Sequence, residues 1–453
     1  MKVAKFGGTS LANAEQVRKV SAIVLSDPER RIVVVSAPGK RFKHDIKITD
    51  LLIACAEARL ASRSAEGEMA AVLDRYAEIA RELELPAGVM QGIEADFRAR
   101  LAAEVCHRDH FIDAIKAGGE DNCARLVAAF LRSQGANASY VSPREAGLIV
   151  TAEFGNAHVL PQSYAKLAAL GDRAGITVFP GFFGYSSDGA VVTFSRGGSD
   201  ISGSILAAAV KASVYENFTD VDSVFSANPH IVPGAHPITE LTYREMRELS
   251  YAGFSVFHEE ALEPVYRAGV PVWIKNTNNP AAPGTRIGLQ RPFVSGSVVG
   301  VAGSPGFCSI YVSKYLMNRE IGFGRRLLQI LEEEGLSYEH TPSGIDNISV
   351  LLRDTKFGAA TEARVVARIR AELDVDDVAV ERDLALVMIV GEGMQHTVGI
   401  AARATRAFAQ SSVNLEMINQ GSSEVSIMFG VKAIDNERAI RALHEEFFDS
   451  RRG

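Results

Sequence analysis

The chain has 453 residues, of which 47% are hydrophobic and 23% are charged, and its formal net charge is −7. This length predicts two or three domains, and the composition is that of an ordinary globular protein with sizeable cores. The negative charge argues against a nucleic-acid-binding surface, and no apolar run reaches the ~20 residues that span a bilayer. Without a signal-peptide core or a C-x-x-C pair, we expect a cytoplasmic protein with reduced thiols and no metal site.

Two segments combine a strand, a glycine pair and the start of a helix, at residues 2–10 and 191–200. Backbone N–H groups and the helix dipole favour anions at such turns, and glycine lets a phosphate approach the backbone. Arg196 adds a planar fork suited to a carboxylate or phosphate, and Asp200 adds a carboxylate that orients a nucleophile or holds a metal. Taken alone, the first segment is more typical of a solvated lysine at a strand end, and the second is equally typical of a capped turn with a surface arginine. The candidate residues are Lys5, Gly7, Gly8, Arg196, Gly197, Gly198 and Asp200.

The first two thirds of the chain alternate between strands and helices. Residues 32–35 are apolar throughout, which predicts a parallel strand covered on both faces. Thr49 is a good N-cap, and from there to about residue 135 the pattern is almost continuously helical. The pair Gly118-Gly119 before Glu120 predicts a helix start with an acid in its favourable position. Residues 182–194 predict a β-hairpin. Together these elements predict one α/β domain with a mostly parallel sheet.

The last third changes character. From about residue 298 the pattern is β-β-α-β-β-α, with strands expected at 337–340 and 415–418 among others. Two tandem units of ~65 residues form an internal repeat at the size of small ferredoxin-like modules. Neither unit holds a cluster of titratable residues typical of catalysis, so both are interpreted as binding or regulatory modules.

Five motifs in order resemble those of aspartate kinases, a family of the amino-acid kinase superfamily. They are residues 5–10 (Lys-Phe-Gly-Gly-Thr-Ser), 33–37 (Val-Val-Val-Ser-Ala), 119–120 (Gly-Glu), 194–200 (Phe-Ser-Arg-Gly-Gly-Ser-Asp) and 218–221 (Phe-Thr-Asp-Val), and residues 413–426 are similar to the family's paired ACT domains. The resemblance covers nearly the whole chain. It implies an α/β fold, with a three-layer amino-acid kinase domain and a mostly parallel sheet (1–292) followed by two ferredoxin-like βαββαβ ACT domains (293–380 and 381–453).

The resemblance implies ATP-dependent phosphorylation of the β-carboxylate of L-aspartate to 4-phospho-L-aspartate, the first step towards lysine, threonine and methionine. Lys5 would bridge the transferring phosphoryl group, and Asp200 would orient either Lys5 or the Mg²⁺-bound phosphates. Glu120 would hold the α-ammonium group, Arg196 the α-carboxylate, and Thr49 would contact the aspartate. Mg²⁺ would be held mainly by the phosphates of ATP. The ATP side would comprise Gly7, Gly8, Thr9, Ser36, Gly197, Gly198, Ser199, Thr219, Asp220, Phe225, His230 and Ser255.

Two positions depart from the family pattern. Residues 228–230 read Asn-Pro-His instead of Asp-Pro-Arg, and Ser255 stands where the family has a lysine. Each lost charge-assisted hydrogen bond typically costs ~1.5–3 kcal/mol, so ATP binding is affected unless His230 or Lys275 compensates. A catalytically weak amino-acid sensor is therefore one alternative. An acetylglutamate or glutamate kinase is another, although the ACT-like tail and residues 5–10 argue against it.

The ACT resemblance further implies feedback control by an amino acid bound where modules meet, in a homodimer formed through the ACT domains. Lysine is the first candidate effector and threonine the second. Backbone amides of the turn at 317–323 would take the carboxylate, and either Glu339 or Asp346 the ammonium group. No nucleic acid or membrane partner is expected. The effector residues would be Met317, Asn318, Phe323, Ser337, Tyr338, Glu339 and Asp346.

Overall fold

A computed structural model describes residues 1–195, 197–254 and 256–449. The chain divides into two units. Unit 1 comprises Met1–Val224, Pro237–Ser250 and Ser255–Arg291, and unit 2 comprises Phe225–His236, Tyr251–Phe254 and Pro292–Gly453. None of the described helices combines the length and apolar character needed to span a membrane. The domain limits at 292 and 380 stay predictions.

Unit 1 is built on an eight-stranded sheet with the strand order β10-β12-β11-β7-β1-β2-β4-β3. All neighbouring strands run parallel except β11 and β12. The apolar run predicted at 32–35 lies in β2, where it is buried on both faces as expected of a covered parallel strand. The strands are β1 (Lys2–Phe6), β2 (Arg30–Val35), β3 (Ala138–Tyr140), β4 (Ile176–Pro180), β7 (Val214–Thr219), β10 (Glu240–Thr242), β11 (Val272–Asn276) and β12 (Thr285–Gly288).

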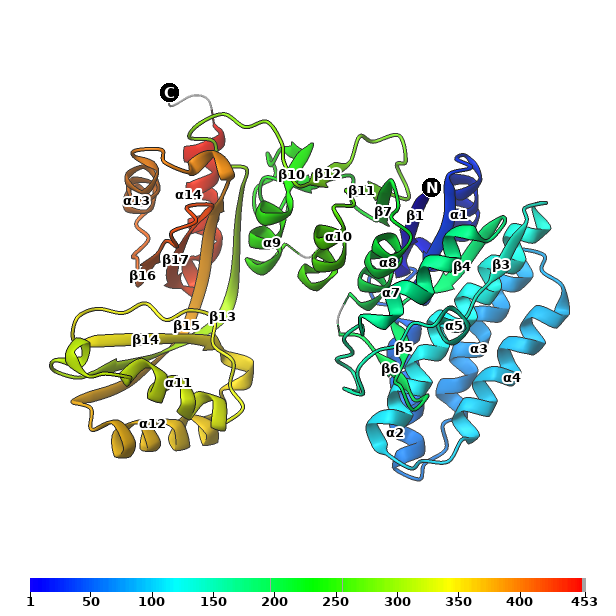
Figure 1. Cartoon of the computed structure of the whole chain (residues 1–453), viewed down its shortest axis with the longest axis horizontal. Coiled ribbons are helices and arrows are strands. Elements are labelled where there is room, and N and C mark those ends of the chain that lie inside the picture. Colours follow the sequence, from blue (N-terminus) through cyan, green and yellow to red (C-terminus); the bar gives the residue numbers. More distant parts are fainter. Residues whose placement is uncertain (196, 255, 450–453) are drawn as a thin grey trace. The chain divides into compact units, whose positions relative to one another are not determined.

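Helices cover both faces of this sheet, which gives the predicted three layers (Figure 1). On one face α1 to α5 share a core with Phe6, Val33 and Phe218, and on the other α8 contacts β1, β2 and β7. The helices are α1 (Ala14–Leu25), α2 (Ile48–Leu60), α3 (Glu66–Glu82), α4 (Ala87–Ala102), α5 (Arg108–Ser133), α6 (Pro143–Ala146), α7 (Gln162–Leu167), α8 (Gly198–Ala209), α9 (Tyr243–Tyr251) and α10 (Leu262–Ala268), with short 3-10 turns η1 (Gly8–Leu11), η2 (Ala168–Asp172) and η3 (Glu259–Ala261).

Two local predictions in the helical region are wrong, and the hairpin is confirmed. Gly118 and Gly119 do not precede a helix but lie inside the 26-residue helix α5. A Cβ atom on Gly119 would lie 2.9 Å from the Cβ of Ala37, so the glycine is needed for close packing rather than for a helix start. Thr49 is not the N-cap of α2, since that position is Lys47. The hairpin consists of β5 (Phe183–Tyr185) and β6 (Val191–Thr193), which pair antiparallel.

A buried ion pair connects β2 to β7, the strands on either side of β1. Arg30 donates to both carboxylate oxygens of Glu216, at 2.6 and 3.1 Å, and the Glu216 side chain is only 1% exposed. Removing one partner of such a pair leaves a buried charge without compensation. We therefore expect Arg30→Met to lower the free energy of unfolding by about 3–5 kcal/mol in urea denaturation. The neighbouring variant Arg31→Met, in which no buried carboxylate loses its partner, should cost less than about 1 kcal/mol.

Unit 2 contains a five-stranded antiparallel sheet with the order β14-β13-β15-β17-β16 (Figure 1). Its two central strands, β13 and β15, are 14 residues long each. One core lies beneath α11 and α12 and a second beneath α13 and α14, so the predicted pair of α/β modules is confirmed. The elements are β13 (Gly300–Ser313), β14 (Asn347–Arg353), β15 (Asp377–Val390), β16 (Met417–Asn419), β17 (Ser426–Lys432), α11 (Phe323–Glu333), α12 (Ala359–Leu373), α13 (Ile400–Gln410) and α14 (Asn436–Phe448), with turns η4 (Met317–Arg319), η5 (Asp354–Lys356), η6 (Glu392–Met394) and η7 (Ala433–Asp435). The short strands β8 (Val224–Phe225) and β9 (Pro237–Ile238) form a separate two-stranded sheet.

The strand predicted at residues 337–340 does not form. His340 makes only a single bridge to Leu351, and no ladder continues from it in the described chain. Pro342 and Gly344 follow closely, and proline lacks the N–H group that a longer ladder would require.

Candidate active site

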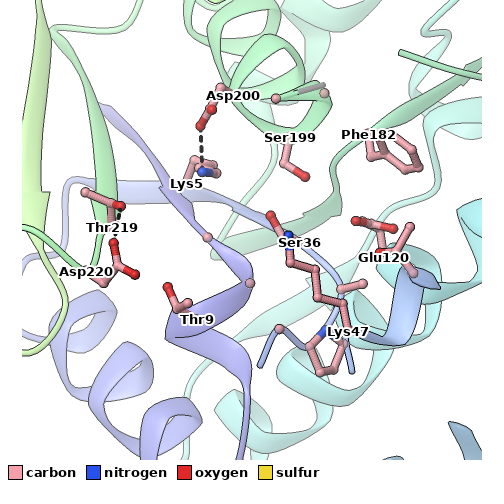
Figure 2. Close-up of a pocket in the computed structure, with 18 of the residues that line it drawn as sticks. Lys5, Thr9, Ser36, Lys47, Glu120, Phe182, Ser199, Asp200, Thr219 and Asp220 are labelled. Atoms are coloured by element: carbon pink, nitrogen blue, oxygen red, sulfur yellow. Dashed lines mark hydrogen bonds and ion pairs between the residues drawn. The ribbon is translucent and has the colours of Figure 1, made fainter. Parts of the chain in front are cut away.

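The largest cluster of predicted site residues lies in one cavity of about 470 Å³ in unit 1. It is at the carboxyl ends of the parallel strands β1, β2 and β7, the usual ligand position in an open α/β sheet. Figure 2 shows Lys5 and Asp200 paired, with Thr219 and Asp220 on one side and Glu120 on the other. The lining residues are Lys5, Gly7, Gly8, Thr9, Ser36, Ala37, Pro38, Gly39, Lys40, Lys47, Thr49, Glu120, Phe182, Gly197, Gly198, Ser199, Asp200, Thr219, Asp220 and Val256.

Lys5 and Asp200 form an ion pair at the end of β1. The Lys5 Nζ lies 2.5 Å from Asp200 Oδ1, and both side chains are largely buried. Asn217 on β7 donates to Asp200 Oδ1 at 2.8 Å and accepts from Lys5 Nζ at 3.5 Å. The amide therefore fixes both charged groups, and the ammonium is held in one orientation. Asp200 lies in the first turn of α8, where the helix dipole favours a carboxylate.

Two glycine turns contact each other beneath the cavity. Gly39 donates from its backbone N–H to the Gly8 carbonyl at 2.8 Å. A Cβ atom on Gly39 would lie 2.5 Å from the carbonyl carbon of Gly8, so no larger residue fits there. At the start of α8, Gly197 has a φ of +76°, which L side chains rarely adopt. The backbone around the cavity is therefore shaped by positions that only glycine can occupy.

Glu120 projects from α5 to the opposite wall. Its side chain is 5% exposed, and its Oε2 atom has no hydrogen-bond partner among the described residues. Burial raises the pKa of Glu120 to about 8, although a hydrogen bond from the backbone of Ala37 acts in the opposite direction. Buried carboxylate oxygens are normally paired, so this one is suited to a ligand that brings its own cationic donor.

The rest of the lining is hydroxyl-rich. Thr219 donates to Asp220 at 3.2 Å, and the hydroxyls of Thr9, Ser36 and Ser199 also face the cavity. Such groups, with the backbone amides of two glycine turns, are suited to phosphate oxygens. Thr49 lines the cavity as predicted.

Of the remaining predicted site residues, two are not described by the structure and two do not line this cavity. Arg196 and Ser255 lie outside the described residues. Phe225 and His230 belong to unit 2 and do not line the cavity. Within unit 2, Ala227 joins the core beneath α13 and α14, and Ser226 Oγ lies 2.9 Å from His444 Nε2.

Lys275 does not line the cavity either. Its ammonium group lies 4.6 Å from the centre of the Trp273 ring, and burial lowers the pKa of Lys275. Sequence reasoning missed Lys40, Lys47, Phe182 and Val256 as lining residues. For the two lysines, the available signal was the basic character of residues 40–47, which follow the Gly39 turn.

The predicted effector residues occupy the first module of unit 2. Asn318 donates its backbone N–H to the Ile345 carbonyl at 3.1 Å, and Asp346 Oδ1 accepts from the backbone of Leu316 at 2.8 Å. Met317 and Phe323 are buried nearby, at η4 and the start of α11, whereas Ser337 and Tyr338 are exposed. Glu339 is engaged elsewhere, since Tyr251 donates to its Oε2 atom at 2.7 Å and Arg353 lies 3.6 Å from its Oε1 atom.

Known proteins resemble this chain over its whole length. Residues 1–276 match the profile of the amino acid kinase family, and residues 387–447 that of an ACT domain. Aspartokinase 3 of Bacillus subtilis is 59% identical over 448 residues, which cover 99% of each chain. The crystal structure of Clostridium acetobutylicum aspartate kinase is 37% identical, with a TM-score of 0.85 over 99% of this chain and 100% of that one.

Two structures of Escherichia coli aspartokinase III, each 25% identical, also match 99% of this chain. One is a complex with aspartate and ADP (TM-score 0.83, covering 100% of that chain), and the other a complex with lysine and aspartate (TM-score 0.73, covering 99%). Identity and coverage at this level are those of members of one family. The chain therefore belongs to the amino acid kinase family and, within it, to the aspartokinases.

Proposed function

We propose that this aspartokinase transfers the γ-phosphoryl group of ATP to the β-carboxylate of L-aspartate, giving 4-phospho-L-aspartate and ADP. The observation that carries the proposal is the buried carboxyl group of Glu120, whose Oε2 atom has no partner among the described residues, in the same cavity as the Lys5–Asp200 pair. A buried carboxyl group that must be ionised to receive an ammonium group stands at one end, and a fixed ammonium stands at the other. This arrangement suits an amino acid that enters with its ammonium group first. The aspartate and ADP complex of the E. coli relative supports the same assignment.

The chemistry requires positioning more than proton transfer. A β-carboxylate is already ionised near neutral pH, so its oxygen can attack the γ-phosphorus while the bond to the ADP oxygen breaks. Lys5 would stabilise the charge on the phosphoryl oxygens, with Asp200 and Asn217 keeping it in place. The amides of Gly7 and Gly8 would bind phosphate oxygens, and Glu120 the α-ammonium group. Arg196 is proposed, from sequence alone, to bind the α-carboxylate.

Mg²⁺ is proposed to accompany ATP. Within the described residues, no three His, Cys, Asp or Glu side chains converge in a group that could hold a metal ion. Asp200 is engaged by Lys5 and Asn217, and Asp220 accepts from Thr219. This donor set fits an ion bound mainly through the phosphates, which would neutralise part of their charge. Asp220 is the side chain best suited to support it.

The regulatory proposal is an amino-acid effector bound at η4, with lysine as the first candidate and threonine as the second. Asp346 is favoured over Glu339 for the effector's ammonium group, because both Glu339 oxygens face Tyr251 and Arg353. The large apolar side chains exposed near this turn are Tyr315, Leu316, Ile321 and Ile345. Such exposure supports a homodimer in which a second copy covers the turn. Through this activity the enzyme would catalyse the first step of lysine, threonine and methionine biosynthesis.

The activity is tested by following ADP formation with L-aspartate and trapping the acyl phosphate with hydroxylamine. We expect ADP and hydroxamate to appear together, only when ATP, Mg²⁺ and aspartate are all present. Glutamate and N-acetylglutamate in parallel test for another amino-acid kinase. Aspartate binding without turnover at millimolar ATP would instead favour a sensor. Adding lysine, threonine and methionine singly and together identifies the effector.

A further inference from the structure

The loop between β2 and α2 forms one wall of the cavity and is firmly anchored. The backbone N–H of Gly39 donates a hydrogen bond to the Gly8 carbonyl, and the backbone N–H of Ile48 donates to the Pro38 carbonyl at 3.3 Å. Arg75 on α3, itself 5% exposed, donates to the Gly39 carbonyl at 3.1 Å. Residues 40–47, which follow the Gly39 turn, are therefore part of the site's framework.

A carboxylate within the loop completes this anchor. Both oxygens of Asp45 accept from Arg75 at 2.9 Å, and Oδ2 also accepts from the backbone and side chain of Arg41 at 2.9 and 3.0 Å. Burial disfavours the Asp45 carboxylate, but the two guanidinium groups outweigh this effect and hold the pKa of Asp45 well below its ordinary value. Asp45 is thus permanently charged at neutral pH and fixes the backbone two residues before Lys47.

Lys47 extends from this anchored loop into the cavity. Figure 2 shows its side chain reaching across the wall towards Ser36, between Glu120 and Lys5. No carboxylate in the described chain is paired with its ammonium group. Lys5 differs in this respect because Asp200 already neutralises it. Lys47 therefore brings an uncompensated positive charge to the space between the two predicted ends of the substrate.

We propose that Lys47 binds the β-carboxylate of the amino-acid substrate and positions it for attack on the γ-phosphorus. This inference rests on the proposed function. Transfer brings a carboxylate against a triphosphate, and the repulsion between these anions must be offset in a partly desolvated cavity. Lys5 is paired with Asp200 and is assigned to the phosphoryl oxygens. The ammonium group of Lys47 has no carboxylate partner in the described chain and can therefore bind the acceptor carboxylate. Lys47 is also a specificity determinant, because its ammonium group favours a substrate with a charged β-carboxylate over one with a neutral β-group.

The test compares two ligands that differ only in that group. L-Aspartate and L-asparagine have the same size, but the β-carboxamide of asparagine is neutral. For Lys47→Met we expect the KM for aspartate to rise about 10- to 100-fold, the loss of one charge-assisted hydrogen bond. The inhibition constant of asparagine against aspartate, and the KM for ATP, should change by less than about threefold. Lys47→Arg should restore most of the aspartate affinity.

Lys43→Met is the matched control, because Lys43 is exposed in the same loop but does not line the cavity. Its kinetic constants should equal those of the wild type. If Lys47→Met weakened the binding of aspartate and of asparagine by the same factor, the proposal would be overturned in favour of a structural role for the loop. A rise confined to the KM for ATP would overturn it in favour of a nucleotide contact. Unchanged constants in an active enzyme would refute it while leaving the proposed function intact, whereas an inactive wild type would refute both.

Discussion

Replacement of Lys5 by alanine is expected to lower kcat for aspartate-dependent ADP formation by about 10³-fold or more. The side chain is the cationic group fixed at the cavity's centre, held by Asp200 and Asn217. The fold should survive, because Asn217 still donates to Asp200 at 2.8 Å and keeps that carboxylate from being left without a partner. Steady-state kinetics with circular dichroism and thermal melting measure the two effects separately.

Lys2→Ala provides the control from the same strand. Lys2 pairs with Asp27 at 2.7 Å, away from the cavity lining. Its loss should change kcat by less than about twofold. A Lys5→Ala enzyme with a near-normal kcat would contradict the role assigned to Lys5, and an unfolded one would show that the Lys5–Asp200 pair is mainly structural.

Glu120→Gln should weaken aspartate binding about 100-fold or more, since the amide offers no charge to the α-ammonium group.

The Glu120→Gln variant should also be more stable than the wild type at alkaline pH. The pKa of Glu120 is raised from its ordinary 4.5 to about 8 by burial, so the folded protein holds a proton that the unfolded chain releases. The wild type therefore loses stability as pH rises from about 4.5 to 8, by up to about 5 kcal/mol, and the glutamine variant does not.

Urea denaturation at pH 5, 7 and 9 measures the difference in stability between the wild type and Glu120→Gln. Glu94→Gln is the control, because Glu94 forms an exposed ion pair with Arg98, so the stability of this variant should follow that of the wild type at each pH. Aspartate binding has a matching pH dependence. Because the ligand requires ionised Glu120, the apparent affinity should rise up to about tenfold per pH unit below pH 8 and level off above it. An affinity independent of pH between 6 and 8 would mean that Glu120 does not bind the ammonium group.

Much of the site could be predicted from local sequence. A strand that ends in a glycine pair and leads into a helix start constrains the backbone over a few residues, and this is why Gly7, Gly8 and Gly198 were identified. Lys5 lies at the carboxyl end of β1, and it is beside Asp200 because α8, which begins at the second glycine turn, packs against β1. The two α/β modules were predictable for the same reason, since their periodicities are local.

What could not be predicted depends on packing between distant segments. The Gly118-Gly119 pair has the sequence of a helix start, but Gly119 is required because α5 packs closely against Ala37, which is 82 residues earlier in the sequence. In the sequence, Lys47 is one of several lysines typical of a solvated loop. Its position in the cavity depends on Arg75 of α3, which anchors the loop through Asp45. Likewise, the motif around His230 indicates a turn but not that its neighbours Ala227 and Ile231 pack in unit 2.

The two long strands of unit 2 have a consequence for anyone who wishes to dissect or recombine these modules. β13 pairs with β15 from Gly300 opposite Val390 to Ser313 opposite Asp377, so the same two strands, with register shifts on either side of Phe307, run from the first hydrophobic core to the second. A cut after residue 380 would divide β15 and leave the severed edge of β13 without its partner. Exchange of regulatory specificity between relatives is therefore best attempted by replacing residues 292–449 together, or by grafting only the turn at η4, which lies outside the shared ladder.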